Sequence, residues 1–407
     1  MQKMTRIHIM VLIAMCGSIA ASIGLVVNIG GLFFTPMANE LGVGRGSVSL
    51  TLTLANLMAA VGGTIMPRVV KPKNYKLIMI VGVVICCGCT VLLGVSSQLW
   101  MLYVLNIIRG FATGFVGTVI GTLILNNWFH KNSGTITSIA LGFSGLAGAV
   151  FSPIFSSLIS SLGWRTSYMI AAAGMAVLYL PMLLFPINLT PEAVGTVAYG
   201  DVPGTEKMKF EDPRLKKASK AAIPAALFAL ACVYAACGGL TTTVVQHFPG
   251  VAETYLLPAS VGAVMLSASM ITNTSGKLLL GFLIDRIGVK KSILLIIILV
   301  AAGAALILTV HSGVAMIIGA ALIGLGYSTS TVGVVMLTRT SFGVENYSRV
   351  YPKVALFTTV SYALGTTLVG FIYDSTGAYT LVFAYILASL VLMAAVLLVL
   401  TGKKKAA

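Results

Sequence analysis

The chain has 407 residues, of which 58% are hydrophobic and only 9% charged, whereas soluble globular domains contain about 25% charged residues. This composition excludes an ordinary soluble domain and indicates an integral membrane protein. Apolar runs of membrane-spanning length recur along the whole chain, which favours a helical bundle over the short alternating strands of a barrel. The formal net charge of +16 raises the question of nucleic-acid binding, which the distribution of the charges answers below.

The first apolar run follows the basic residues Lys3 and Arg6 and continues to about residue 34. Because this run is too long for the hydrophobic region of a signal peptide, we interpret it as the first membrane span. All six cysteines fall within apolar runs. We therefore expect them to be small packing residues and not members of disulfides.

Dividing the apolar runs at charged and turn residues predicts twelve membrane-spanning helices. The first six cover residues 7–35, 46–67, 75–97, 99–126, 134–161 and 166–186, and the second six cover residues 221–248, 257–284, 291–310, 313–338, 350–372 and 378–401. Between the two sets, residues 187–220 contain three prolines and six Lys or Arg residues, which is typical of a polar linker. The domains expected from this pattern are an N-terminal six-helix bundle (1–186), a cytoplasmic linker (187–220) and a C-terminal six-helix bundle (221–407).

The charged residues are distributed unequally over the loops between these spans. If the N-terminus is cytoplasmic, most of the 26 Lys and Arg residues fall on the cytoplasmic side, whereas the outer loops carry only Arg45 and Arg165. The positive-inside rule therefore predicts a multi-pass protein of the cell (inner) membrane with both termini in the cytoplasm. Because orientation explains the net charge of +16, nucleic-acid binding is not needed to account for it.

The two halves of the chain resemble each other. The segment from Leu162, LGWRTSYMIAAAGMAVLYL, aligns with the segment from Thr376, TGAYTLVFAYILASLVLMA. In addition, Arg68 and Arg286 each close the second span of their half. This pattern favours a duplication of six helices, an arrangement that is common in transporters whose substrate site lies between the repeats.

A lysine lies deep in the eighth predicted span. Lys277 precedes the charged turn at Asp285 by eight residues, or about 12 Å of helix, which places it near the middle of a hydrocarbon core about 30 Å thick. A lysine at that depth costs on the order of 2.5 to 3.5 kcal/mol. We therefore expect Lys277 to face protein or a water-filled cavity.

Besides Lys76 and Lys291, which lie at the cytoplasmic ends of their spans, two further cations, Arg109 and Lys353, lie within predicted spans, whereas none of the ten acidic residues does. Since buried charges are normally paired, we hypothesise that the missing partner is an anionic substrate. Alternatives stay open for each cation: backbone contacts or loss of the proton for Lys277, a structural role for Arg109, and snorkelling to the interface for Lys353.

Five polar residues near the centres or outer ends of spans are further candidates for substrate contact. They are Tyr327 and Tyr234, and Asn28, Gln246 and His247. The alternatives are bundle packing for the tyrosines and simple hydrogen bonding for the histidine. The spans contain no Ser/His/Asp set, paired carboxylates or metal-spaced His/Cys cluster, so we expect neither an enzyme nor a metal or cofactor site.

The turn after the eighth span, GFLIDRIGVKK from Gly281 to Lys291, resembles the G-x-x-x-D-R-x-G-x-R/K-R/K signature of the major facilitator superfamily. The resemblance implies an all-α membrane protein with twelve transmembrane helices in two pseudo-symmetric six-helix bundles. In this family the glycine allows close helix approach and the charged residues latch one conformation. The gating residues implied here are Gly281, Asp285, Arg286 and Arg68. In the first half Pro67 replaces the acid, which predicts a weaker latch.

Within that superfamily, Gly276-Lys277 and the segment from Asn346 to Lys353 resemble the oxalate/formate antiporter and monocarboxylate transporter branch. Those carriers place a basic residue on each of the two helices to hold carboxylates. The chain departs from the branch by having lysine where arginine is usual, and Pro352 alters the register next to Lys353. Arg109, followed by glycines, resembles the arginine of the superfamily's fourth helix.

We therefore predict a secondary active transporter of small organic anions, mono- or dicarboxylates, that works by alternating access through exchange or proton-linked transport. We expect a monomer in the lipid bilayer that uses no cofactor. One alternative is a proton-driven drug exporter, which would require an embedded Asp or Glu. Another is a transport-silent sensor, which would require a signalling tail, and we expect none because three lysines and two alanines follow the last span.

Overall fold

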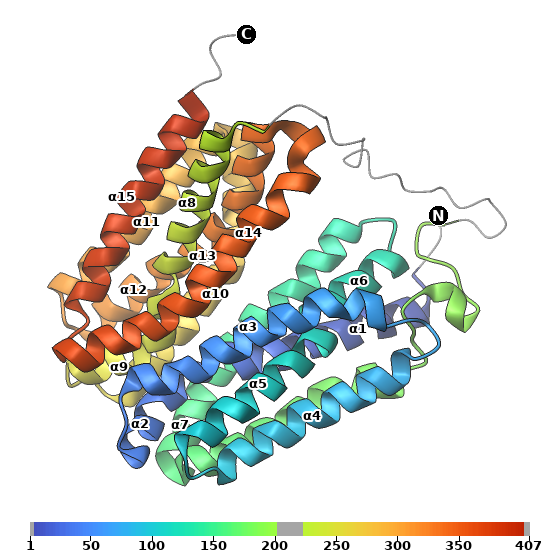
Figure 1. Ribbon diagram of the computed structural model, residues 1–407, viewed down its shortest axis with the longest axis horizontal. Coiled ribbons are helices and arrows are strands. Elements are labelled where there is room, and N and C mark those ends of the chain that lie inside the picture. The colour runs from blue at the N-terminus through green and yellow to red at the C-terminus, as the bar shows by residue number, and fades with distance from the viewer. Residues whose placement is uncertain (1–3, 202–222, 403–407) are drawn as a thin grey trace. The chain divides into compact units, whose positions relative to one another are not determined.

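The computed structural model describes residues 4–201 and 223–402, which are almost entirely helical (Figure 1). The chain divides into two compact units. The first comprises Met1–Val43 and Ser47–Met208, and the second comprises Gly44–Gly46 and Lys209–Ala407. Each unit has its own core of apolar side chains that are removed from solvent.

The first unit holds the six spans of the N-terminal half. Its segments are α1 (Arg6–Ile19), a π-helical segment (Ala20–Asn28), a 3₁₀ turn (Gly30–Phe33), α2 (Phe34–Leu41), α3 (Arg45–Val69), α4 (Tyr75–Val95), α5 (Leu99–Val116), α6 (Thr118–Trp128), α7 (Ser133–Leu184) and a 3₁₀ turn (Pro191–Val194). The 52-residue α7 is broken at Gly163, whose φ of 79° is not helical. This break separates the fifth and sixth predicted spans.

The second unit follows a similar plan. Its segments are α8 (Ala225–Thr241), a 3₁₀ turn (Thr243–His247), α9 (Phe248–Thr254), α10 (Ala259–Ile287), α11 (Val289–Thr309), α12 (Gly313–Gly324), α13 (Gly326–Ser328), a π-helical segment (Thr329–Gly333), α14 (Val334–Thr376) and α15 (Thr380–Gly402). Gly343, with φ of 74°, breaks α14 as Gly163 breaks α7. The tenth and eleventh predicted spans meet at this break.

Ten helical segments of the described residues are long and apolar enough to cross a membrane. One of them is α7, which contains two spans. A twelfth span is α10, whose 29 residues extend about 43 Å but include many Ser, Thr and Asn side chains. The fold is thus the predicted all-α membrane fold with twelve helices, and α10 is not among the ten apolar segments because its middle turns are polar.

Gly163 and Gly377 occupy matching positions in the two aligned segments. Their φ angles are 79° and 69°. Positive φ is costly for residues with a Cβ, by about 1–2 kcal/mol, so both turns require glycine. Gly288, in the charged turn after α10, also has a positive φ of 80°. The last turn of each half thus requires a glycine, although the two backbones differ there, with ψ of 163° at Gly163 and 6° at Gly377.

Glycines also set the contact between α10 and its neighbours in the second unit. A Cβ on Gly324 would collide with the Ser269 carbonyl oxygen and the Thr272 hydroxyl, and a Cβ on Gly276 would lie 3.0 Å from Leu325. At Gly281, in contrast, a Cβ would meet no atom within 4 Å. The glycine-mediated contacts of α10 within the second unit therefore lie earlier along the helix, and the close helix approach expected at Gly281 stays a prediction.

Replacing Gly324 with alanine should lower the stability of the folded protein by about 1–3 kcal/mol, because the added methyl group has no free space. The matched control is Gly281→Ala, which adds the same methyl group to open space and should be neutral or stabilising, since alanine favours helix over glycine. Thermal unfolding of the purified variants in detergent measures both. Equal loss of stability in the two variants would contradict this packing.

The first part of the predicted linker packs on the first unit. The backbone of Tyr199 pairs with Phe129, the indole of Trp128 donates to the Asn188 carbonyl at 2.9 Å, and His130 Nδ1 lies 2.8 Å from Asp201 Oδ1. Residues 188–201 are therefore bound to helix ends of this unit. Residues 202–220 of the predicted linker lie outside the described part of the chain.

A lysine caps the C-terminal end of α7. Lys76 Nζ, at the start of α4, donates to the carbonyls of Leu183 at 2.9 Å and Phe185 at 2.6 Å. The last carbonyls of a helix have no partner within the helix and carry partial negative charge. The ammonium group satisfies them and fixes α4 against α7.

Candidate substrate site

Lys277 lies on α10, about 15 Å from the helix end at Ile287. Its side chain is partly buried, and no described residue forms a hydrogen bond or ion pair with it. The preceding residue, Gly276, packs directly on Leu325 and lies close to Ser328. Lys277 therefore lies at the level of α13, the short helix that carries Tyr327.

The embedded cations have no acidic partner in the described part of the chain. The three ion pairs found there involve Arg45, His130 and Arg165, so Lys277, Arg109 and Lys353 take part in none of them. For a cation within the membrane this is an unfavourable arrangement, because its charge is removed from water without compensation. Arg109 is the most buried of the three cations, with 4% exposed, and Lys277 is partly buried.

Tyr327 belongs to a polar cluster that joins three segments of the second unit. The rings of Tyr327 and Tyr362, on α14, have centroids 6.3 Å apart, and Gln246 Nε2 donates to the Tyr362 hydroxyl at 3.4 Å. The structure thus brings two of the predicted residues together through a third, Tyr362, that the sequence reasoning missed. Its position near the middle of the predicted span 350–372 was the available signal.

Asn273 was also missed. It lies one helical turn before Lys277 on α10, its side chain is 8% exposed, and its Oδ1 atom is buried without a hydrogen-bond partner among the described residues. The spacing of four residues from Lys277 could have identified it, since residues i and i+4 share one face of a helix.

Two predicted residues of the second unit make internal contacts. Tyr234 is fully buried, and its hydroxyl donates to the Thr329 carbonyl at 3.4 Å. His247 is also buried, with Nε2 2.8 Å from the Thr366 carbonyl. These contacts favour the packing alternative for Tyr234 and the hydrogen-bonding alternative for His247.

Two other predicted residues lie inside the first unit. Arg109 is 4% exposed and donates from Nη2 to Asn106 Oδ1 at 2.5 Å, while its Nε has no partner among the described residues. Asn28 closes the π-helical segment and donates to the Ser144 carbonyl at 2.8 Å. The single side-chain partner of Arg109 is neutral, so its charge is also uncompensated.

The remaining predicted residues are exposed. Lys353 is exposed on α14, which favours the snorkelling alternative. In the charged turn, the Arg286 guanidinium stacks 4.5 Å over the ring of Phe282, and Asp285 is exposed, as is Arg68 at the end of α3. The latch that these residues were expected to form stays a prediction.

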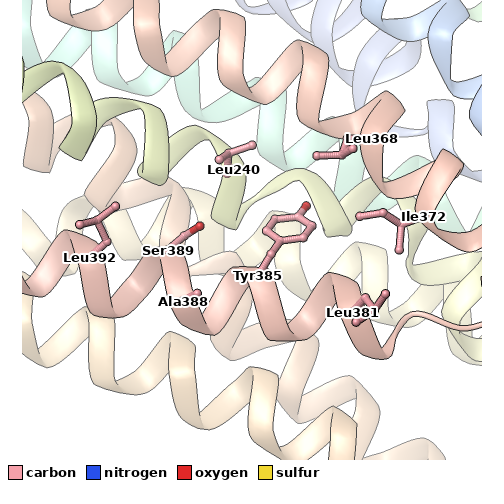
Figure 2. Close-up of a pocket in the computed structure, with 8 residues that line it drawn as sticks. All are labelled: Leu240, Leu368, Ile372, Leu381, Tyr385, Ala388, Ser389 and Leu392. Atoms are coloured by element: carbon pink, nitrogen blue, oxygen red, sulfur yellow. The ribbon is translucent and has the colours of Figure 1, made fainter.

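A separate pocket of about 430 Å³ lies between α8, α14 and α15 (Figure 2). Its lining is almost wholly apolar, with the ring of Tyr385 in its centre, and the Tyr385 hydroxyl lies 2.6 Å from the Thr243 hydroxyl. No cation lines it. This pocket lacks the charge that an anion requires, so it is distinct from the Lys277 region.

Twelve helices in two six-helix sets, with a cation that has no described acidic partner in each set (Arg109 and Lys277), define a multi-pass membrane protein. Comparison with models of protein families identifies its family. The model of the Major Facilitator Superfamily matches residues 10–266 and 226–407, and the chain belongs to this superfamily. No curated protein matches the sequence.

Solved structures of the same fold are distant in sequence. A bacterial homologue of the human lysosomal transporter Spinster, in an inward-facing and occupied conformation, is 14% identical with a TM-score of 0.67, over 99% of this chain and 96% of that one. The nucleoside transporter NupG is 13% identical with a TM-score of 0.69, over 98% of this chain and 100% of that one. Because the sequence identity to both structures is so low, the similarity shows a shared fold and nothing about substrate.

Proposed function

We propose that the protein carries small carboxylates, mono- or dicarboxylates, across the cell membrane by alternating access, with both termini in the cytoplasm. The observation that carries the proposal is Lys277, a partly buried cation in the middle of α10 that has no acidic partner in the described chain. A substrate carboxylate supplies that partner.

The chemistry around Lys277 supports a small polar anion. An ammonium group forms short, charge-assisted hydrogen bonds with a carboxylate, and these are about twice as strong as neutral ones. The cluster of Tyr327, Tyr362 and Gln246 lies in the same unit and offers hydroxyl and amide groups together with aromatic walls. Such a combination suits a ligand that is charged at one end and small overall.

A nucleoside, the class of substrate for which the transporter NupG is named, is a weaker candidate. A neutral nucleoside would leave the ammonium of Lys277 without a counter-ion in a site shielded from water. Binding of a neutral ligand would therefore lack the favourable electrostatic interaction between an anion and the ammonium group. Charge thus favours a carboxylate over a neutral ligand of similar polarity.

Thermal unfolding of the purified protein with a series of ligands tests the proposal. A ligand that binds the folded protein stabilises it by RT ln(1 + [L]/Kd), about 2.7 kcal/mol at a hundredfold excess over Kd. We expect stabilisation by one or more C2 to C5 mono- or dicarboxylates, and none by the matched neutral amides or by uridine. Stabilisation by uridine or the amides, without any carboxylate effect, would contradict the proposal.

A further inference from the structure

The pocket between α8, α14 and α15 is a groove that follows one side of α15 (Figure 2). Leu381, Tyr385, Ala388 and Leu392 line it at spacings of three or four residues, so they form a single stripe along the helix. Between Leu381 and Leu392 the stripe is about 16 Å long. Apolar side chains of α8 and α14 form the opposite side of the groove, namely Leu240, Leu368 and Ile372.

The groove is open on the outside of the second unit. Leu368, Leu381 and Leu392 are 47%, 57% and 46% exposed. Ala388 is exposed between them, and its short side chain leaves the centre of the stripe hollow. Because α14 and α15 contain membrane spans, these exposed apolar side chains face hydrocarbon. The groove is therefore continuous with the surface that lipid covers.

The lining offers little to a polar occupant. The Thr243 hydroxyl donates to the Leu240 carbonyl at 2.7 Å, so the Tyr385 hydroxyl, 2.6 Å away, donates to Thr243. Among the described residues that line the groove, the other polar side-chain group is the Ser389 hydroxyl. An ordered water needs about two to four polar partners, and a charged group needs a counter-ion. The favoured occupant is therefore apolar.

The length and depth of the groove match one leaflet of a bilayer. It begins near the start of α15 at Thr380, which the predicted topology places on the outer side. Since the hydrocarbon core is about 30 Å thick, a groove about 16 Å long crosses the outer half of it. Left empty, this space of about 430 Å³ would deprive its lining of dispersion contacts. A flexible lipid tail, which is as apolar as leucine, fills it.

We propose that this groove binds one hydrocarbon chain of an outer-leaflet phospholipid, whatever its headgroup, and that the bound lipid stabilises the second unit. The chain lies along α15 and packs on Tyr385 and Ala388. It also covers Leu240, one residue before the end of α8, after which the 3₁₀ turn Thr243–His247 begins. The lipid thus supports the junction at which the seventh span changes its helix type.

Native mass spectrometry of the purified protein tests the proposal, because it counts the lipids on each protein molecule. The protein is prepared in a steroid-based detergent, which has no linear alkyl chain to compete for the groove. Palmitoyl-oleoyl phosphatidylcholine and the anionic palmitoyl-oleoyl phosphatidylglycerol are titrated separately. We expect one lipid per monomer to bind about tenfold or more tightly than any further lipid. Its affinity should differ by less than about threefold between the two headgroups, because no cation lines the groove.

Two variants locate the lipid. Ala388→Phe places a ring in the centre of the groove and should weaken binding of the first lipid by about tenfold or more. Ala305→Phe is the matched control, because it adds the same ring at an exposed position of α11 outside the pocket, and it should bind lipid as the wild type does. Without lipid, Ala388→Phe should unfold at no lower temperature than the wild type. Added phosphatidylcholine should stabilise the wild type and Ala305→Phe but not Ala388→Phe.

A measurement on the wild type alone gives the position of the chain. Phosphatidylcholine with a photoreactive diazirine in one acyl chain is bound at one equivalent and irradiated, and the labelled residues are identified by peptide mapping. They should fall on the lining contributed by α14 and α15, between residues 368 and 392. Labelling confined to other helices would overturn the proposal, even if a variant did not fold.

Other occupants of the groove give different results. If the protein is a dimer without lipid and Ala388→Phe makes it monomeric, a second copy covers the groove and the proposal is wrong. If only phosphatidylglycerol binds, the lipid is held by its headgroup and the groove is not the site. Equal lipid binding by the wild type and Ala388→Phe, or no lipid on the wild type, also contradicts the proposal. None of these results bears on the carboxylate function, which depends on Lys277.

Discussion

Replacing Lys277 with glutamine should abolish carboxylate uptake while the protein still folds. Glutamine keeps most of the side-chain volume but removes the positive charge on α10 that has no acidic partner among the described residues. Loss of a charge-assisted contact to a buried ligand group costs several kcal/mol, which corresponds to at least about a hundredfold lower affinity. Uptake of a labelled carboxylate into liposomes containing each variant measures the effect, and thermal unfolding without ligand checks folding.

Two further variants sharpen this prediction. Lys277→Arg keeps the charge but changes the geometry of its donors, so it should retain part of the activity. Lys353→Gln is the matched control, because it removes the same charge from an exposed position on α14 and should transport nearly as well as the wild type. Near wild-type uptake by Lys277→Gln would show that Lys277 does not bind the substrate.

Uptake into liposomes should depend on substrate already inside them. With equal pH on both sides, vesicles loaded with unlabelled carboxylate should accumulate label rapidly, whereas empty vesicles should accumulate almost none. The reason is electrostatic: without substrate, the positive charge of Lys277 must enter a closed, water-poor state unpaired, which is costly. A bound anion removes most of that penalty, so only the loaded carrier reorients readily.

Proton-linked transport is the alternative outcome. The predicted spans hold no acid to bind a coupling proton, so a lysine would have to release its proton when the site is empty. An imposed pH gradient distinguishes the two modes. Strong gradient-driven uptake into empty liposomes would contradict obligatory exchange, and protein-free liposomes provide the control for leakage.

Much of the fold could be predicted because a membrane imposes simple rules on a sequence. Span length, polar interruptions and the repeated pattern around Gly163 and Gly377 predicted twelve helices, and both glycines have the positive φ that such turns require. The wide π-helical turns at Ala20–Asn28 and Thr329–Gly333 could not be predicted. The apolar pattern of the sequence does not mark them, and such turns are frequent at functional sites.

The candidate site was predicted only in part. The depth of Lys277 followed from helix geometry, and its partial burial without a described partner agrees with the expectation. The roles of Tyr362 and Asn273 depend on which face of a helix is buried and which polar atoms remain unpaired. Neither property can be predicted from an almost uniformly apolar run, because the two faces of such a helix differ little in composition.

Because Lys76 caps the end of α7, not every basic residue at this end of the first unit is free to bind lipid. A lysine whose three donors are directed at backbone carbonyls is less available to anionic lipid headgroups, which attract free Lys and Arg side chains by about 1 kcal/mol each near the membrane surface. The attraction of this side of the protein to acidic lipids is therefore weaker than its number of basic residues implies.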